Sequence, residues 1–170
     1  MITQNHLKEI VYYDTETGVF TWKPRPIRDG RMRRHDLQWN TRYAGRRADR
    51  VAPSGYRRIS LGNKKMQAHR AAWLYVNGYL PPEIDHVNRV RGDNRITNLR
   101  PASHAENIVN QSPQARRNGA LKGAYRHRKR WHAKITLDWK VIFLGSFDTA
   151  EEAHAVYMKA AKEAWGEFAA

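Results

Sequence analysis

Hydrophobic positions in the first part of the chain follow two periods, one helical and one extended. Leu7, Ile10 and Val11 lie at helical spacing, whereas residues 56–61 alternate between polar and apolar side chains. The Gly-Asn pair at 62–63 is typical of a hairpin turn. The pattern therefore predicts a helix at residues 7–11, a strand at 19–22, a hairpin at 56–68 and a helix at 69–78.

Residues 23–50 show neither period. They hold ten Lys or Arg residues against three Asp, with two Pro and few aliphatic side chains. This composition predicts either a mobile basic loop that lies near nucleic acid or a solvated surface loop, and the sequence favours neither.

The last third of the chain has its own alternation. Residues 111–121 are rich in Gln, Ser, Pro, Asn and Gly and predict a linker. Strands are expected at 130–137 and 141–147, with residues 122–126 as the candidate for a third. A helix should follow Thr149, because Thr149 and Glu152 form a capping-box pattern, and Gly166 should end it.

The alternation also assigns the two faces of this second sheet. One face is expected to carry polar and exposed side chains, and the other should pack on the helix and form a core. The first set is Arg130, His132, Lys134, Val141 and Phe143, and the second is Trp131, Ala133, Ile135, Ile142 and Leu144.

The net charge of the chain indicates what kind of molecule it binds. The chain has 170 residues, with 31 Lys or Arg against 16 Asp or Glu, so its formal net charge is +15. Such a charge favours a polyanionic partner and salt-sensitive binding. Absence of Cys excludes disulfides and Cys-ligated zinc. No apolar run approaches the roughly 20 residues that cross a bilayer, and we expect a cytoplasmic protein that binds neither membranes nor a small-molecule substrate.

Polar residues with complementary chemistry gather between positions 85 and 107. Asp85 offers a carboxylate oxygen to a hard cation such as Mg²⁺. Neutral His86 could take a proton from water, because the reference pKa of histidine is about 6.5. Ser103 and Glu106 form a second capping-box pattern, so a helix should begin there and carry Asn107. These features predict a centre that hydrolyses phosphodiesters.

This run resembles the HNH endonucleases, particularly the phage homing endonucleases. The residues that carry the resemblance are Asp85-His86, Asp93-Asn94-Arg95, Asn98-Leu99-Arg100 and Asn107, preceded by Ala68-His69-Arg70. The resemblance implies a ββα-metal hairpin and helix. It also implies that His86 is the general base and that Asn98 braces the loop holding it. Asp85 and Asn107 would hold one divalent ion per active site, Mg²⁺ or Mn²⁺ rather than Zn²⁺.

The C-terminal segment resembles the ethylene-response-factor (Apetala-type) DNA-binding domain. The segments that carry this resemblance are 122–125, 131–135, 144–153 and 157–161. It implies a three-stranded antiparallel sheet packed on one helix, with the sheet in the DNA major groove. Tyr125 and Val141 stand where plant members have DNA-contacting Arg, so no sequence preference carries over.

The predicted fold is therefore α+β in four parts. These are an N-terminal α/β extension with a basic loop (1–55), an HNH nuclease core (56–112), a linker (113–121) and a DNA-binding domain (122–170). The candidate DNA contacts are Arg95, Arg100, Lys122, Arg126, Arg128, Arg130, His132, Lys134 and Phe143. Arg95 and Arg100 could equally be solvated charges.

These features predict a sequence-specific, metal-dependent endonuclease that acts on double-stranded DNA. We expect a monomer or weak dimer in the cytoplasm of a bacterial or phage-infected cell. Two alternatives stay open at this point. One is a catalytically inert DNA-binding regulator, and the other is an RNA-binding or ribosome-associated protein, which only the charge favours.

Overall fold

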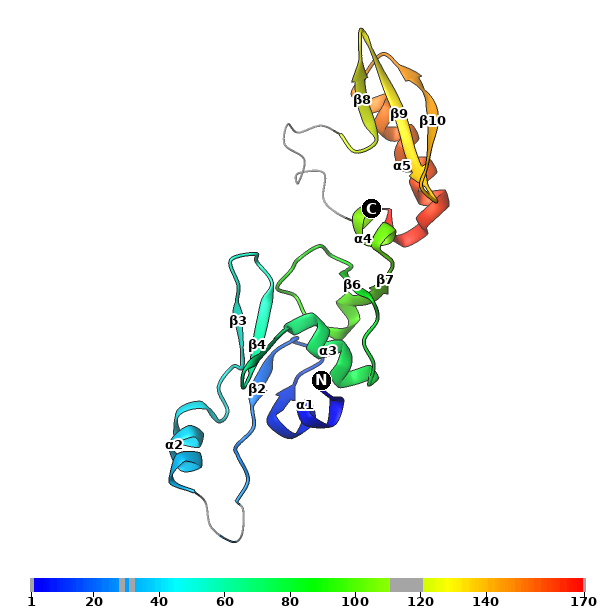
Figure 1. Ribbon diagram of the computed structural model, residues 1–170. Coiled ribbons are helices and arrows are strands. Elements are labelled where there is room, and N and C mark those ends of the chain that lie inside the picture. Colours follow the sequence, from blue (N-terminus) through cyan, green and yellow to red (C-terminus); the bar gives the residue numbers. More distant parts are fainter. Residues whose placement is uncertain (1, 28–29, 31–32, 111–120, 170) are drawn as a thin grey trace. The chain divides into compact units, whose positions relative to one another are not determined.

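The structure is a computed structural model of the chain, and it describes residues 2–27, 30, 33–110 and 121–169 (Figure 1). Helices and strands are mixed along the chain, which confirms the α+β prediction. The chain divides into two compact units, Met1–Pro101 and Ala102–Ala170.

The first unit combines short helices with small antiparallel sheets. Its first elements are α1 (Gln4–Ile10), β1 (Val11–Tyr13), β2 (Phe20–Trp22) and α2 (Arg34–Tyr43). They are followed by β3 (Asp49–Val51), β4 (Arg57–Leu61), β5 (Lys64–Gln67), α3 (Ala68–Asn77), β6 (Glu83–His86) and β7 (Leu99–Ala102). The pairs β1-β2 and β6-β7 are two-stranded, and β3-β4-β5 form a three-stranded sheet. The predicted helices, strand and hairpin are confirmed.

The hydrophobic core of this unit joins α1, the first strands and α3. Leu7, Val11, Phe20 and Ile59 are fully buried in it. Tyr13 stacks on Phe20 with ring centroids 4.5 Å apart. Burial of side chains this large supplies the main stabilisation of a small domain.

The loop prediction for residues 23–50 is wrong at 34–43, where the chain forms α2. Polar contacts stabilise this helix, which explains why a hydrophobic period could not reveal it. The Asn40 side chain accepts from the Arg25 backbone N–H at 2.8 Å and donates to the Arg25 carbonyl at 3.1 Å. Trp39 packs edge-on against Trp22, with centroids 5.7 Å apart.

The second unit contains a sheet and its covering helix, after a short helix at its start. The elements are α4 (His104–Asn110), β8 (Ala124–His127), β9 (Arg130–Leu137), β10 (Lys140–Phe147) and α5 (Ala150–Trp165), and a 3₁₀ turn (Gly166–Phe168) follows. The sheet is antiparallel with order β10-β9-β8, and residues of α5 form its core with β9. This confirms the predicted three-stranded sheet on one helix. The capping box of Thr149 and Glu152 is present. The predicted linker falls almost wholly at 111–120, outside the described residues.

The predicted division of sheet faces holds with one exception. Ala133 and Ile135 are buried, whereas Val141 and Phe143 are 67% and 56% exposed. Ile142 was expected in the core and is 42% exposed. Ile142 lies on the edge strand β10 and is not among the residues that pack around its strand partner Ile135, so much of its side chain stays exposed. None of the helices in the described ranges is long and apolar enough to traverse a bilayer.

Candidate active site

Asp85 and His86 close strand β6, and both are only 5% exposed. On the neighbouring strand β7, Arg100 donates from Nε to Oδ2 of Asp85 at 2.9 Å, and its Nη2 lies 2.9 Å from the same oxygen. Arg100 was a candidate DNA contact, but the structure commits its mostly buried guanidinium to this carboxylate. The two groups therefore compensate each other's charge in a poorly solvated place.

The His86 ring has a defined partner. Its Nε2 lies 3.3 Å from Oδ1 of Asn94, which is 1% exposed. The Asn94 amide nitrogen donates to the Gly92 carbonyl, so the side-chain oxygen faces the ring. Nε2 therefore carries the proton, and the lone pair of the neutral ring is on Nδ1.

Burial keeps the His86 ring neutral. Desolvation lowers the pKa of His86, and this outweighs the hydrogen bond to Asn94 and the charge of Asp85, which both raise it. The His69 ring meets His86 edge-on at 5.1 Å, and Tyr56 lies 5.9 Å from it. Burial, helped by electrostatic repulsion from His86 and Arg70, lowers the pKa of His69 to about 3. Both imidazoles are thus uncharged near neutral pH.

Asn98 ties together the loop between β6 and β7. Its side-chain oxygen accepts from the Asn88 backbone N–H at 3.0 Å, and its amide donates to the Asp93 carbonyl at 2.8 Å. The Asn98 backbone carbonyl accepts from the N–H of Val87, the residue after His86. These contacts agree with the bracing role that the resemblance implies, since Asn98 acts on the loop through both its side chain and its backbone.

Asp93 gathers further loop contacts. Arg95 donates from Nε and Nη2 to its two carboxylate oxygens at 2.9 and 2.6 Å, and Asn88 donates at 2.6 Å. The Arg95 hydrogen bond is the main cause that lowers the pKa of Asp93 to about 2. Arg95 was a candidate DNA contact, and the structure pairs it with this carboxylate while leaving it half-exposed.

Sequence reasoning missed the support that this loop receives from the N-terminal strands. The Tyr13 hydroxyl on β1 donates to the Asn94 carbonyl at 2.7 Å. Gly18, in the turn between β1 and β2, packs so closely that an added Cβ would lie 2.5 Å from the Arg95 nitrogen. Neither residue has a sequence signal for this role, because the contact spans about 80 positions. For Asn94 the sequence allowed either turn chemistry or a site role, and its burial against the ring favours the site.

Asn107 lies on α4, in the second unit. The predicted capping box at the start of this helix is present: Glu106 accepts from the Ser103 N–H at 2.7 Å, and Ser103 accepts from the Glu106 N–H at 3.3 Å. Among the described residues, no group of three or more His, Cys, Asp or Glu could hold a metal ion. The donors of interest are one carboxylate and one amide oxygen, a set that suits a hard cation. The sharing of an ion by Asp85 and Asn107 stays a prediction.

The candidate DNA contacts of the second unit differ in exposure. Lys122 is a correction, because it is 6% exposed and its ammonium donates to the Val109 carbonyl in the last turn of α4. A buried ammonium bound in this way is structural and is not available to DNA. Arg126 is exposed but lies on the helix side of the sheet, beside its strand partner Trp131. The others lie on the open face or in the adjoining turn: Arg128, Arg130 and Phe143 are exposed, and His132 and Lys134 are half-buried.

The part of the chain that contains this site is similar to known HNH endonucleases. The family model described as HNH endonuclease matches residues 66–109, which include the β6–β7 loop and most of α4. The chain is also 32% identical over 123 residues to a protein of Acanthamoeba polyphaga mimivirus described as an uncharacterized HNH endonuclease. Both similarities support the HNH endonuclease family.

The extent of these similarities is limited. The alignment with the mimivirus protein covers 71% of this chain and 64% of that protein, so the chain spans just under two thirds of the relative's length. The family match ends before residue 122. The resemblance of residues 122–170 to the ethylene-response-factor domain therefore stays a prediction.

Proposed function

We propose that this chain is a DNA endonuclease of the HNH type that hydrolyses phosphodiester bonds with one divalent metal ion, Mg²⁺ or Mn²⁺. The observation that carries the proposal is the environment of His86. A buried, neutral imidazole next to a carboxylate, oriented by Asn94 in a loop tied by Asn98, is suited to accept a proton near pH 7.

The chain's own residues would divide the work. His86 would take the proton from the attacking water at Nδ1 while Asn94 holds Nε2–H, which fixes the tautomer and the ring plane. Asn98 would act as a positioning residue through the loop. Asp85 and Asn107 would hold the metal ion, which would neutralise charge on the scissile phosphate and assist the leaving oxygen.

The exposed sheet face of the second unit would bind duplex DNA. Arg130 and Phe143 are exposed on that face, and Arg128 is exposed in the adjoining turn. Arg126 is exposed beside Trp131 on the other face, where it can contact a phosphate at the edge of the sheet. Arg side chains can grip phosphates and read guanine edges in the major groove. This arrangement supports an enzyme in which the residues around His86 cut DNA and the sheet of residues 124–147 binds it. Target-site specificity and a homing role rest on resemblance.

A plasmid nicking assay tests the metal requirement. Supercoiled DNA should be cut by the wild-type chain in Mg²⁺ or Mn²⁺ and left intact in excess chelator. Asp85→Asn should lose at least about a hundredfold in rate, because a neutral amide is a poorer ligand for a hard cation. Equal cutting in chelator would contradict the metal-dependent mechanism.

Asp85→Asn also leaves Arg100 without its charged partner, so folding must be controlled. The double variant Asp85→Asn with Arg100→Gln removes the unpaired buried cation. It should recover thermal stability but not activity. Recovery of cutting by the double variant would make the role of Asp85 structural.

A further inference from the structure

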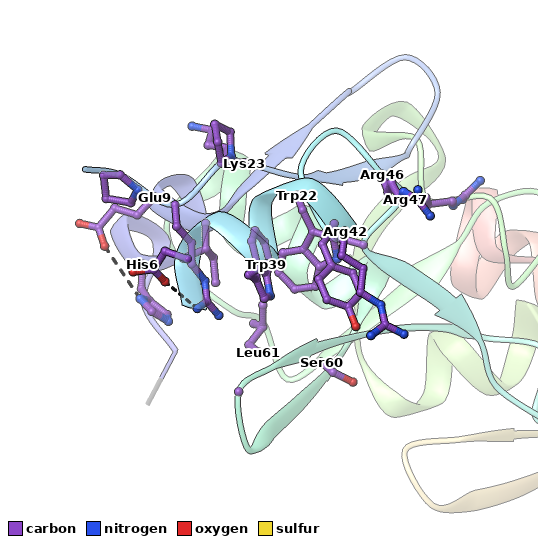
Figure 2. A pocket seen from close by; sticks show the side chains of 18 of the residues that line it. His6, Glu9, Trp22, Lys23, Trp39, Arg42, Arg46, Arg47, Ser60 and Leu61 are labelled. Carbon is purple, nitrogen blue, oxygen red and sulfur yellow. Dashed lines mark hydrogen bonds and ion pairs between the residues drawn. The ribbon is translucent and has the colours of Figure 1, made fainter. Parts of the chain in front are cut away.

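A cavity of about 1040 Å³ opens in the first unit, and no predicted catalytic residue is among the described residues that line it. Its walls come from α1, β2, α2, β3 and β4 and the segments between them (Figure 2). Two carboxylates, Glu9 and Asp36, face eight cationic side chains in the described lining. These are Lys23, Arg25, Arg33, Arg42, Arg46, Arg47, Arg50 and Arg58.

The arginines on the two faces of the β3-β4 pair differ in whether they have a carboxylate partner. Asp49 is buried and pairs with both Arg47 and Arg57, so each of these two guanidinium groups has a carboxylate partner. Arg50 and Arg58 are direct cross-strand partners. Both are exposed, both line the cavity, and neither makes an ion pair within the part of the chain that the structure describes.

Like charges directly opposite on an antiparallel pair destabilise a sheet. The Arg50–Arg58 pair therefore costs stability that the fold does not recover through a carboxylate of its own. An anion placed between the two guanidinium groups would remove the repulsion and could accept hydrogen bonds from both. The pair thus indicates an anionic ligand.

The aromatic side chains of the cavity indicate whether it binds a base or a phosphate of a nucleic acid. Arg25 covers the face of Trp39 at 4.5 Å, and Arg42 lies 5.4 Å from the ring centre of Tyr43. Trp39 also packs edge-on against Trp22. Figure 2 shows Trp22, Trp39 and Arg42 gathered together. Ring faces already covered by the protein's own arginines are poor platforms for a base. A phosphate is therefore the better ligand.

We propose that this cavity is a second DNA site that binds the sugar–phosphate backbone without reading bases, with Arg50 and Arg58 sharing one phosphate. The proposal deepens the proposed function, because it takes duplex DNA as the polyanion. It assigns Arg50, Arg58 and the other described residues of the cavity lining to gripping the substrate, a role separate from that of His86. The affinity that this site contributes should fall with rising salt and should not depend on the DNA sequence.

Arg50→Glu separates this role from folding. The introduced carboxylate would face Arg58 across the strands and form an ion pair, so the melting temperature should stay level or rise. DNA affinity should fall about tenfold, because one shared phosphate contact is lost and a repulsive charge is added. Arg50→Gln, which only removes charge, should show the same direction with a smaller loss.

The matched control is Lys65→Glu, which makes the same charge change at an exposed position of β5 outside the cavity lining. All variants carry His86→Ala to prevent cutting, and binding is measured by fluorescence anisotropy on AT-rich and GC-rich duplexes of about 30 base pairs, long enough for a typical protein–DNA interface. Arg50→Glu should bind more weakly than the control on both duplexes, with a salt slope lowered by about one.

The two proposals fail in different ways. Equal affinity of Arg50→Glu and Lys65→Glu would overturn the second site whether or not the wild-type chain cuts DNA. A loss confined to one duplex composition would overturn the backbone assignment. Selective loss by Arg50→Glu in a chain that never cuts would support the second site and remove the nuclease function.

Discussion

At the scale of single residues, the candidate active site depends on keeping histidine uncharged. His69 and His86 share a buried pocket with Tyr56, and burial is the main cause that lowers both histidine pKa values. An unfolded chain exposes these rings and binds their protons at ordinary values. The centre therefore loses stability at acid pH, while both rings stay uncharged at neutral pH.

The pH dependence of stability follows from His69. Its pKa is about 3 in the folded chain and 6.5 in the reference state, so the unfolded chain binds the extra proton between these values. Stability should be fully present above pH 6.5 and decline as pH falls below it. Urea unfolding at about pH 7 and about pH 5 measures this decline. His69→Phe should reduce the slope by about one proton, and an unchanged slope would contradict the neutral assignment.

A glycine supports the loop that holds His86. Gly18 has a positive φ of 70°, and an added Cβ would meet the backbone of Asn94 and Arg95 at 2.5 Å. Gly18→Ala should lower the free energy of unfolding by more than about 2 kcal/mol, since strain adds to a backbone clash. It should also reduce cleavage, because the loop must move. Gly62→Ala is the control, with positive φ and open space. Equal losses of stability and cleavage in the two variants would contradict the proposal that Gly18 supports the His86 loop.

Individual site residues differ in how well the sequence predicts them. His86 and Asn98 are carried by a motif with fixed spacing, and the structure gives both a consistent environment. Asn94 is a candidate for orienting His86 because it is buried against the ring. Tyr13 supports the loop through a contact with a residue 81 positions away in the chain. Long-range contacts of this kind leave no local pattern.

At the scale of elements, the hairpin between β9 and β10 contains a strained turn. Asp138 and Trp139 have φ of 46° and 66°, and Trp139 is 96% exposed. Left-handed backbone favours Gly or Asn at this position. Trp139→Gly should stabilise the second unit by about 0.5–1 kcal/mol. Thermal melting measures this gain, and a loss of stability would show that the exposed indole contributes packing.

Elements with a regular hydrophobic period could be predicted, and those stabilised by polar contacts could not. The hairpin, α3, the second sheet and α5 follow from alternation, helical spacing and caps. Helix α2 lies in a basic segment whose Asn40 bonds with Arg25 are invisible to a hydrophobicity pattern. Ile142 fits the alternation of its strand, but it lies on the edge strand β10 and is not among the residues that pack around Ile135.

At the scale of the whole molecule, some cationic side chains are exposed and can bind DNA, whereas others are buried and stabilise the fold. Arg126, Arg128 and Arg130 are exposed on the second unit, whereas Lys122 is buried. Replacing the three arginines by Gln should weaken DNA binding and flatten its salt dependence with little change in melting temperature. Lys122→Gln should do the reverse, because it breaks the bond to Val109. Anisotropy titrations across salt, paired with melting curves, would contradict this division if both variants behaved alike.

The most direct measurement of the central claim is the single-turnover cleavage rate of His86→Ala in Mg²⁺, with DNA affinity and melting temperature determined on the same preparation. We expect a rate loss of about 10²–10⁴-fold, with affinity close to that of the wild-type chain. A variant that folds, binds DNA and still cuts at the wild-type rate would contradict the assignment of His86 as the general base.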